Sequence, residues 1–312
     1  MVAVIVSVAA TLAAVAALLV LWLLLTIDFF APSRADVAGW RRYGGWALVT
    51  GASSGIGRAF AEQIASAGVS VVLVARRRER LEELAARLRE AHGVEALVVQ
   101  QDLSAPGASA RVWEAAGERQ VGILVCNAGF AATGPFDEID AKTLTDLVNV
   151  SCLAYTELTR LALPGMVARG NGAVVYVSAL GGDIPAGGIG LYAGAKAFAL
   201  RLAQSLFAEN VRRGVHVIAV QPGKTRSEIF ESAIGLSAAS LGERTRRRLE
   251  RIGGEEDART GEDVAMTALA NLGKRASIVD GRSNRLIVGV ARLMNPTALV
   301  KRVDFLGLNR QA

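Results

Sequence analysis

The stretch Thr50-Gly51-Ala52-Ser53-Ser54-Gly55-Ile56-Gly57 decides the fold, because it joins a short apolar run to a helical pattern. The apolar run covers residues 46–49, and the helical pattern covers residues 58–67. Glycines let a backbone turn tightly and approach a phosphate closely, while the N–H groups at a helix start attract an anion. The stretch therefore predicts a cradle for nucleotide phosphates, although taken alone it also fits an ordinary glycine-rich turn between a strand and a helix.

Short apolar runs alternate with helical patterns through most of the chain. Runs that are apolar throughout are typical of strands buried on both faces of a parallel sheet. They cover residues 47–49, 69–75, 96–100, 121–126, 173–177 and 215–220. The helical patterns cover residues 58–67, 77–91, 108–118, 141–168 and 192–213. This order predicts a single α/β domain over residues 46–280, with a doubly wound parallel sheet of the Rossmann type.

The first 28 residues predict a transmembrane anchor. Residues 1–27 carry no charged side chain, and about 20 apolar residues span a bilayer as a helix. A cleaved signal peptide is the alternative, but it would have a basic start and a shorter apolar stretch. Arg34, Arg41 and Arg42 follow the stretch and no basic residue precedes it. The positive-inside bias therefore predicts a single-pass membrane protein whose catalytic domain faces the cytoplasm.

Three further segments complete the predicted organisation. Residues 29–45 are expected to form a short linker between the anchor and the domain. Residues 228–260 include a charged helical pattern and are expected to form a lid over a pocket. The C-terminal tail, residues 281–312, is amphipathic, so it could pack on the core or lie on a membrane surface.

The composition limits the classes of partner. The net charge is +6 (35 basic minus 29 acidic residues), but the basic clusters lack the aromatic or zinc-ligand patterns of nucleic-acid-binding proteins. No nucleic-acid partner is therefore expected. Attraction to anionic lipids would account for the basic clusters, and solvated helix faces would account for them equally well. Two cysteines and two isolated histidines give neither a disulfide framework nor a metal site.

Tyr192 and Lys196 form a candidate catalytic pair. Their spacing of four residues places both side chains on one face of a helix. A neighbouring ammonium lowers the pKa of a tyrosine towards neutral pH, which makes proton transfer possible. Such a pair is often a plain surface contact, but this one opens the helix after the fifth apolar run. That position lies at the carboxyl edge of the sheet, where doubly wound folds bind their ligands.

The residues after the second apolar run indicate the cofactor. An NAD-binding domain has an acidic residue at this point, to bind the ribose hydroxyls. Here Arg76 is followed by two further arginines, and no acid occurs before Glu79. A guanidinium suits a 2′-phosphate, so Arg76 predicts NADPH rather than NADH. Arg77 or Arg78 is expected to be a solvated residue at the helix start.

Six short motifs, in order along residues 46–227, resemble those of the short-chain dehydrogenase/reductase family. They are Thr50 to Gly57, Asp102, Asn127-Ala128-Gly129, Asn149, the pair Tyr192 and Lys196, and Pro222-Gly223. The segments 46–57 and 158–178 look most like the membrane-anchored 17β-hydroxysteroid dehydrogenase and 3-ketoacyl-CoA reductase branch and its bacterial relatives.

The resemblance implies a role for each motif. Tyr192 would protonate a carbonyl oxygen as hydride arrives, Lys196 would lower its pKa, and Asn149 would hold a water in the proton relay. Asp102 would contact the adenine. The residues implied to bind the cofactor are Gly51, Ser53, Ser54, Gly55, Ile56, Gly57, Arg76, Asp102, Leu103, Asn127, Ala128, Gly129, Tyr192, Lys196, Pro222, Gly223, Thr225 and Ser227.

One position departs from the family pattern. The family's carbonyl-polarising serine aligns with Ala179, and Ser178 lies one residue earlier. Either the loop shifts so that Ser178 serves, or Tyr192 and water polarise the carbonyl, or activity is impaired. The loss of one such donor can cost about a hundredfold or more in rate.

The resemblance and the predicted anchor together imply a membrane-anchored, NADPH-dependent oxidoreductase that interconverts a carbonyl and an alcohol. The expected substrate is lipophilic, such as a 3-ketoacyl chain, a steroid or another lipid ketone. By analogy with the family, residues 141–168 and 192–213 would pair in a homodimer. The alternative is a membrane-tethered scaffold or sensor that binds NADP(H) but has impaired catalysis, which Ala179 favours.

Overall fold

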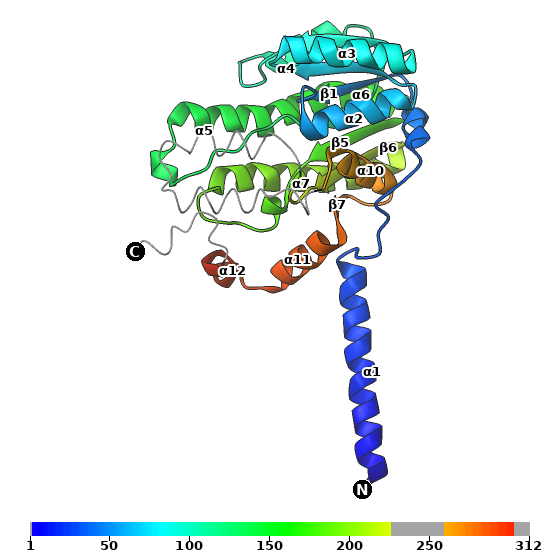
Figure 1. Ribbon diagram of the computed structural model, residues 1–312, viewed down its shortest axis with the longest axis vertical. Helices are drawn as coiled ribbons and strands as arrows, with labels where there is room; N and C mark the ends of the chain where they lie inside the picture. Colours follow the sequence, from blue (N-terminus) through cyan, green and yellow to red (C-terminus); the bar gives the residue numbers. More distant parts are fainter. Residues whose placement is uncertain (1, 226–258, 303–312) are drawn as a thin grey trace.

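A seven-stranded parallel sheet lies at the centre of the computed structural model, which describes residues 2–225 and 259–302 (Figure 1). The strand order is β3-β2-β1-β4-β5-β6-β7, so the chain starts in the middle and winds outwards in both directions. The strands are β1 (Trp46–Thr50), β2 (Ser70–Ala75), β3 (Ala96–Gln100), β4 (Val121–Cys126), β5 (Gly172–Val177), β6 (Val215–Gln221) and β7 (Ser277–Val279). The doubly wound parallel sheet is confirmed, and β7 is an additional edge strand that the sequence did not predict.

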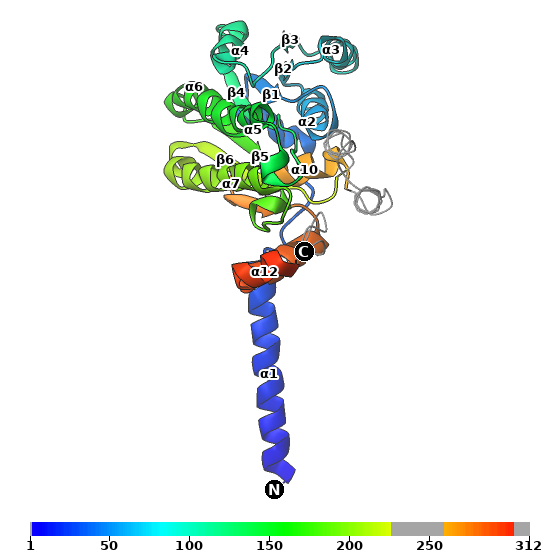
Figure 2. The same cartoon turned by 90° about the vertical axis from the view of Figure 1, so that its left-hand side faces the viewer.

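Helices cover both faces of the sheet, as Figure 2 shows. One face packs against α2 (Gly55–Ser66), α3 (Arg78–His92) and α10 (Gly261–Asn271). The other face packs against α4 (Ala108–Ala116), α6 (Ala154–Ala168) and α7 (Gly190–Asn210). Successive strand residues point to opposite faces, and both faces are buried, which explains why the strand sequences are apolar throughout.

Shorter elements connect these layers. The 3-10 helices are η1 (Val37–Tyr43), η2 (Phe136–Glu138), η4 (Leu180–Gly182) and η5 (Val211–Arg213). The predicted helix over residues 141–168 is divided into α5 (Ala141–Val148), a π-helical turn η3 (Asn149–Leu153) and α6. The Ala154 N–H bonds the Asn149 carbonyl, five residues earlier, which marks the wider turn. The turn falls at one of the candidate catalytic residues.

The N-terminal helix α1 (Val2–Thr26) projects away from the domain as a single rod (Figure 1). Within the described residues, no helix is found that is both long and apolar enough to cross a membrane. Side chains of α1 are described only in part. The predicted anchor over residues 1–28 is therefore not confirmed and stays a prediction.

The segment after α1 is packed against the domain. Residues 29–45 were predicted to be a linker, and within them η1 places Trp40 in the core, fully buried against Phe60 of α2. Asp36 caps η1 by accepting a hydrogen bond from the Ala38 N–H. The connection between α1 and the sheet is thus an ordered part of the core.

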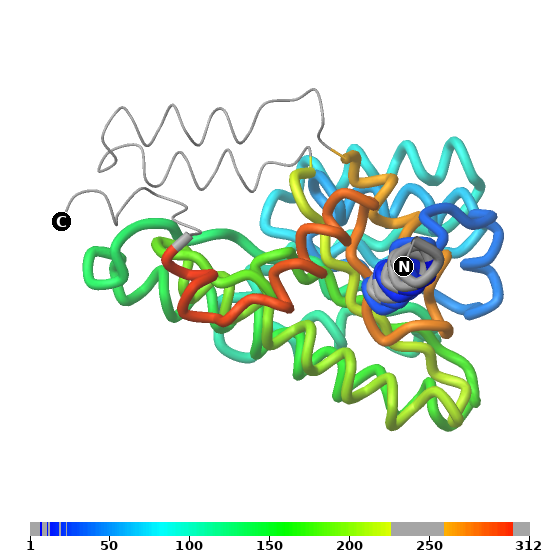
Figure 3. Tube along the Cα trace, turned by 90° about the horizontal axis from the view of Figure 1, so that it is seen from below, coloured from blue at the N-terminus to red at the C-terminus, as the bar shows by residue number. Residues whose placement is uncertain are grey.

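The C-terminal part folds across the end of the domain from which α1 leaves. It consists of α11 (Arg282–Leu293) and α12 (Pro296–Arg302), which Figure 3 shows lying across the side that α1 faces. The predicted lid, residues 228–260, lies outside the described residues except for its last two positions. Residues 303–312 of the predicted tail also lie outside them.

Candidate active site

The glycine-rich turn leaves room at the carboxyl end of β1. Gly51 has a φ of +68°, and a Cβ there would lie 2.6 Å from the Asn127 side-chain nitrogen. A Cβ on Gly57 would overlap the Gly51 carbonyl, so both positions require glycine. Ser54, which precedes α2, makes no side-chain capping bond. The first N–H groups of α2 are therefore available to an anion in the cleft.

Thr50 fixes the opposite wall of this cleft. Its hydroxyl accepts hydrogen bonds from the backbone N–H groups of Asn127 (2.9 Å) and Ala128 (3.0 Å) and donates to the Val125 carbonyl (3.1 Å). The Asn127 side chain donates in return to the Thr50 carbonyl at 2.9 Å. These bonds join the ends of β1 and β4 and hold the segment from Asn127 to Gly129 beside the turn.

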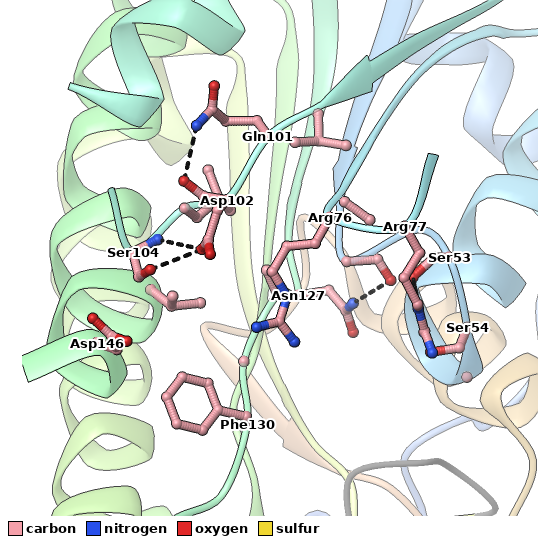
Figure 4. A pocket seen from close by; sticks show the side chains of 18 of the residues that line it. Ser53, Ser54, Arg76, Arg77, Gln101, Asp102, Ser104, Asn127, Phe130 and Asp146 are labelled. Carbon is pink, nitrogen blue, oxygen red and sulfur yellow. Dashed lines mark hydrogen bonds between the residues drawn. The ribbon is translucent and has the colours of Figure 1, made fainter. Parts of the chain in front are cut away.

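A cavity of about 500 Å³ opens at the carboxyl ends of β1 to β4 (Figure 4). It brings together predicted cofactor residues from four separate parts of the chain, namely Gly51, Ser53, Ser54, Gly55, Ile56, Arg76, Asp102, Leu103, Asn127, Ala128 and Gly129. Further lining residues were missed, namely Val74, Ala75, Arg77, Gln101, Ser104, Phe130, Thr143, Asp146 and Val150. Most of these directly adjoin a predicted residue, and their position next to a strand end could have identified them.

Arg77 contacts the glycine-rich turn directly. Its guanidinium donates to the hydroxyls of Ser53 (3.0 Å) and Ser54 (2.9 Å). Arg78 is instead exposed and pairs with Glu82 at 3.0 Å. The solvated position expected of Arg77 or Arg78 therefore applies to Arg78. Figure 4 shows Arg76 and Arg77 both within the pocket, so both guanidiniums lie close to any anionic group that binds there.

Asp102 lies at the far side of the pocket, with its carboxylate held by the loop after β3 (Figure 4). It accepts hydrogen bonds from the Ser104 N–H (2.9 Å) and the Ser104 hydroxyl (2.8 Å). Burial by itself would raise the pKa of Asp102. The bonds from Ser104 and the charges of Arg76 and Lys142 outweigh burial, so this pKa is lowered and the carboxylate is ionised at neutral pH.

Tyr192 and Lys196 lie one turn apart on α7, as their spacing predicted. The Lys196 Nζ atom is 5.7 Å from the centre of the Tyr192 ring and donates to the Val177 carbonyl at 2.9 Å. A Cβ on Gly129 would lie 3.5 Å from this Nζ. Gly129 lines the nucleotide cavity, so the buried ammonium lies directly behind the wall of that cavity, whereas Tyr192 is not among its lining residues.

The protonation of this pair differs from the expectation. Burial raises the pKa of Tyr192 to about 12, and burial lowers the pKa of Lys196 to about 8. Burial therefore opposes the expected lowering of the Tyr192 pKa. The physical reason is that loss of hydration disfavours both charged forms, while the Lys196 ammonium is directed at the Val177 carbonyl.

Ser178 does not offer a free hydroxyl. It is 2% exposed, and its hydroxyl donates to the Lys196 carbonyl at 2.7 Å. The suggested carbonyl-polarising role of Ser178 conflicts with this arrangement, because the hydroxyl is bonded to the backbone of α7. Ala179, which the resemblance aligns with the family's serine, is also largely buried, and its side chain has no hydrogen-bond donor.

The remaining predicted residues lie around this centre. The Asn149 side chain donates to the Ser104 carbonyl at 3.1 Å, so it faces the loop that holds Asp102. Pro222 accepts a backbone bond from the Leu180 N–H, next to Ala179. Thr225 is buried and donates to the Gly223 carbonyl at 3.1 Å. Ser227 lies outside the described residues.

The family model described as short chain dehydrogenase matches residues 45–234, which is more than half of the chain. The chain belongs to the short-chain dehydrogenase family. The cavity at the glycine-rich turn contains most of the residues that the family resemblance implied for cofactor binding. The family assignment agrees with the order of the six motifs.

Individual relatives of this dehydrogenase match about three fifths of the chain. It is 34% identical over 184 residues to a very-long-chain 3-oxoacyl-CoA reductase of Anas platyrhynchos, covering 57% of this chain and 59% of that protein. It is 34% identical over 193 residues to an inactive hydroxysteroid dehydrogenase-like protein 1 of Mus musculus, covering 61% and 58%. The chain thus spans about three fifths of the length of these relatives.

The fold also matches a solved structure. A short-chain dehydrogenase from Sphingobium yanoikuyae in complex with NADPH aligns with a TM-score of 0.65 and 35% sequence identity. The alignment covers 75% of this chain and 86% of that chain.

Proposed function

We propose that this short-chain dehydrogenase uses NADPH to reduce a ketone on a lipophilic substrate, and that α1 tethers it to a membrane with the domain facing the cytoplasm. The observation that carries the proposal is the position of Lys196. Its ammonium lies behind the Gly129 wall of the nucleotide cleft and one helical turn from Tyr192. A proton donor and a hydride donor can therefore meet at the same end of the cleft.

The cleft fits a phosphorylated dinucleotide. The space at Gly51 and Gly57, together with the uncapped start of α2, suits a pyrophosphate. Arg76 and Arg77 would bind a 2′-phosphate, and the first acidic side chain after β2 is Glu79. These features favour NADPH over NADH, as does the NADPH bound to the Sphingobium relative.

Bound NADPH supplies the hydride that the carbonyl carbon receives. Tyr192 supplies the proton to the carbonyl oxygen, since its raised pKa keeps the hydroxyl protonated at neutral pH. Lys196 would bind the ribose hydroxyls and stabilise the phenolate that the transfer leaves behind. Asn149 would hold the water that returns a proton to Tyr192. One hydride and one proton thus convert a ketone to an alcohol.

The proposed membrane tether is supported by α1, and the proposed lipophilic substrate is supported by the relatives. Several large apolar side chains of α1 are exposed, among them Leu18, Trp22 and Leu25. An apolar helix that stands apart from the domain is suited to a bilayer. The Anas relative is named for a long-chain acyl substrate. A ketone that is dissolved in the same bilayer is the substrate that such a tethered domain meets most often.

A second candidate function is a tethered NADP(H)-binding scaffold or sensor with impaired catalysis. Ala179 and the bonded Ser178 hydroxyl favour it, because no described side chain in the loop after β5 offers a hydroxyl to polarise a carbonyl. The Mus relative that is called inactive shows that close similarity in this family does not guarantee turnover.

We further propose that the chain forms a homodimer through α6 and α7. Leu153, Leu161 and Phe198 are exposed near or on these helices. A dimer contact through these helices would cover these apolar side chains. The molar mass of the detergent-solubilised chain, measured by light scattering, tests this part of the proposal.

The decisive experiment follows oxidation of NADPH, and separately of NADH, by the full chain in detergent. The ketone panel extends from 3-ketoacyl thioesters to steroids and includes a simple aldehyde. We expect an alcohol to form from a lipophilic ketone, with NADPH clearly preferred. If NADPH binds but no ketone is reduced, the scaffold or sensor is the correct function. Equal use of NADH would reject the role given to Arg76 and Arg77.

A further inference from the structure

The outer face of α11 carries an apolar stripe, which we define as Leu286, Ile287, Val290 and Leu293. Their side chains are exposed by 44%, 53%, 47% and 67%. They share one side of the helix, since Leu286, Val290 and Leu293 are spaced by three or four residues and Ile287 adjoins Leu286, and the opposite side is buried. A contiguous exposed patch of this kind marks a binding surface.

The segment that carries the apolar stripe has only basic charged residues in its sequence. Residues 281–301 include Arg282, Arg285, Arg292 and Lys301 and contain no Asp or Glu. Arg282 and Arg292 are exposed at the two ends of α11. An apolar stripe with basic residues beside it suits the boundary between acyl chains and anionic headgroups, where each basic residue adds electrostatic attraction.

The end of α1 is fastened to the inner side of α11. Arg285 is 1% exposed, and its guanidinium donates to the carbonyls of Ala31 (2.7 Å) and Asp28 (3.1 Å). The Asp28 carboxylate also pairs with Arg275 at 2.7 Å. Gly289 meets the side chain of Ile27 so closely that a Cβ would overlap it. The helix that would enter the bilayer and the helix that carries the apolar stripe are therefore held together.

The arrangement of α1 and α11 indicates what covers the apolar stripe. Figure 2 shows α11 and α12 crossing the C-terminal end of α1, between α1 and the body of the domain. If α1 crosses a bilayer, a helix that lies across the C-terminal end of α1 runs parallel to the bilayer surface. The side chains of Trp22 and Leu25, near the end of α1, are also exposed.

We propose that the apolar stripe of α11 docks on the bilayer that α1 enters, and that anionic phospholipids are its partner. This inference rests on the tether in the proposed function. It adds a second, surface contact that fixes how the domain sits on the membrane.

The docking helix also borders the candidate active site. Arg292 pairs with Asp183 at 2.8 Å, and Asp183 accepts a bond from the Gln221 side chain, at the end of β6. Asn284 lies against Gly223, so closely that a Cβ on Gly223 would overlap the Asn284 side chain. The helix α11 is therefore next to the loop after β5 and the segment after β6. A ketone dissolved in the bilayer would reach the site with little exposure to water.

Fluorescent labels on the full chain test the docking. Single cysteines replace Ile287 on the stripe, Glu90 on α3 at the opposite end of the domain, and Leu18 in α1. The unsubstituted chain gives the background from Cys126 and Cys152. Each labelled chain is reconstituted in vesicles of phosphatidylcholine and phosphatidylserine. Quenching is then measured with nitroxide lipids and with iodide in the water.

We expect the Ile287→Cys label to be quenched several-fold more by a shallow nitroxide lipid than the Glu90→Cys label, and to be protected from iodide. Equal iodide quenching of these two labels would overturn the docking. Protection from iodide without quenching by lipid would overturn it as well, because protein, such as a second copy of the chain, would then cover the stripe.

The Leu18→Cys label separates this inference from the tether. If this label is quenched by deep nitroxide lipids while the Ile287→Cys label is not, the tether stands and the docking fails. If neither label is quenched, the tether fails and the docking fails with it. None of these readings depends on turnover, so they are independent of the proposed catalysis.

Discussion

Ala179 has only a methyl group at the position that the resemblance aligns with the family's serine, and the neighbouring Ser178 hydroxyl is bonded to the Lys196 carbonyl. We therefore expect the Ala179→Ser variant to reduce ketones faster, by about tenfold to a hundredfold in kcat, because a donor to the carbonyl oxygen is restored. The control is Ala179→Gly, which changes size without adding a hydroxyl. A serine variant that is no faster than wild type would show that carbonyl polarisation does not limit turnover.

The buried Lys196 predicts a pH dependence. Its pKa is lowered to about 8, so the ammonium is present below that pH and is lost as the pH rises through it. Tyr192 keeps its proton up to a pH of about 12 and does not contribute in this range. We expect kcat/KM for ketone reduction, which reports the free enzyme, to fall as the pH rises through about 8. Lys196→Arg, which keeps its charge, should remove this fall if the variant retains activity, and a fall that persists would assign it to another group.

The contacts of Arg77 predict that it contributes more to NADPH binding than the adjacent Arg78 does. Arg77 contacts Ser53 and Ser54 in the cleft, whereas Arg78 is exposed and pairs with Glu82. Arg77→Ala should weaken NADPH binding by about tenfold or more, since a bond to a charged group contributes about 1.5–3 kcal/mol. NADH binding should change much less. Arg78→Ala is the matched control, and equal losses in the two variants would contradict the assignment.

At the scale of single residues, the sequence predicted most of the residues that line the cleft. It did not predict the direction of each side chain. The glycines, Arg76, Asp102 and Asn127 follow from motif and position. The directions of Arg77 and the Ser178 hydroxyl depend on partners far away in the chain, namely Ser53 and the Lys196 carbonyl. No local pattern contains such partners, so the sequence did not predict them.

At the scale of elements, the periodicity of the sequence predicted most strands and helices to within a few residues. It did not predict the π-helical turn η3, because one helical pattern continues through residues 141–168. It also did not predict β7, because a strand of three residues is too short to show a pattern. Both features become defined only when neighbouring elements pack against them.

The helix η1 gives a test of stability at this scale. Trp40 is fully buried against Phe60, so Trp40→Ala should lower the free energy of unfolding by about 3–5 kcal/mol. Phe136→Ala, at a 63% exposed position, should change it by less than about 0.5 kcal/mol. Denaturant unfolding of both variants measures the difference. Similar, small losses would mean that η1 is not part of the cooperative core.

At the scale of the whole molecule, one region would bind the cofactor and another would contact the membrane. The nucleotide cleft lies at the carboxyl ends of β1 to β4, and α1 with α11 forms the end that would face the membrane (Figure 1). The sequence predicted both regions separately. It could not predict that α11 links them, because the link consists of the Asp183–Arg292 pair and the Arg285 contacts, which join residues more than 100 positions apart.

The central claim is that Tyr192 donates a proton during ketone reduction by NADPH, and Tyr192→Phe tests it most directly. The account predicts that NADPH oxidation with a reducible ketone falls by about a hundredfold or more, while NADPH binding changes little. Tyr43→Phe is the control, since it removes a hydroxyl that is buried away from the cleft and bonded to His216. Turnover by Tyr192→Phe at the wild-type rate would contradict the account.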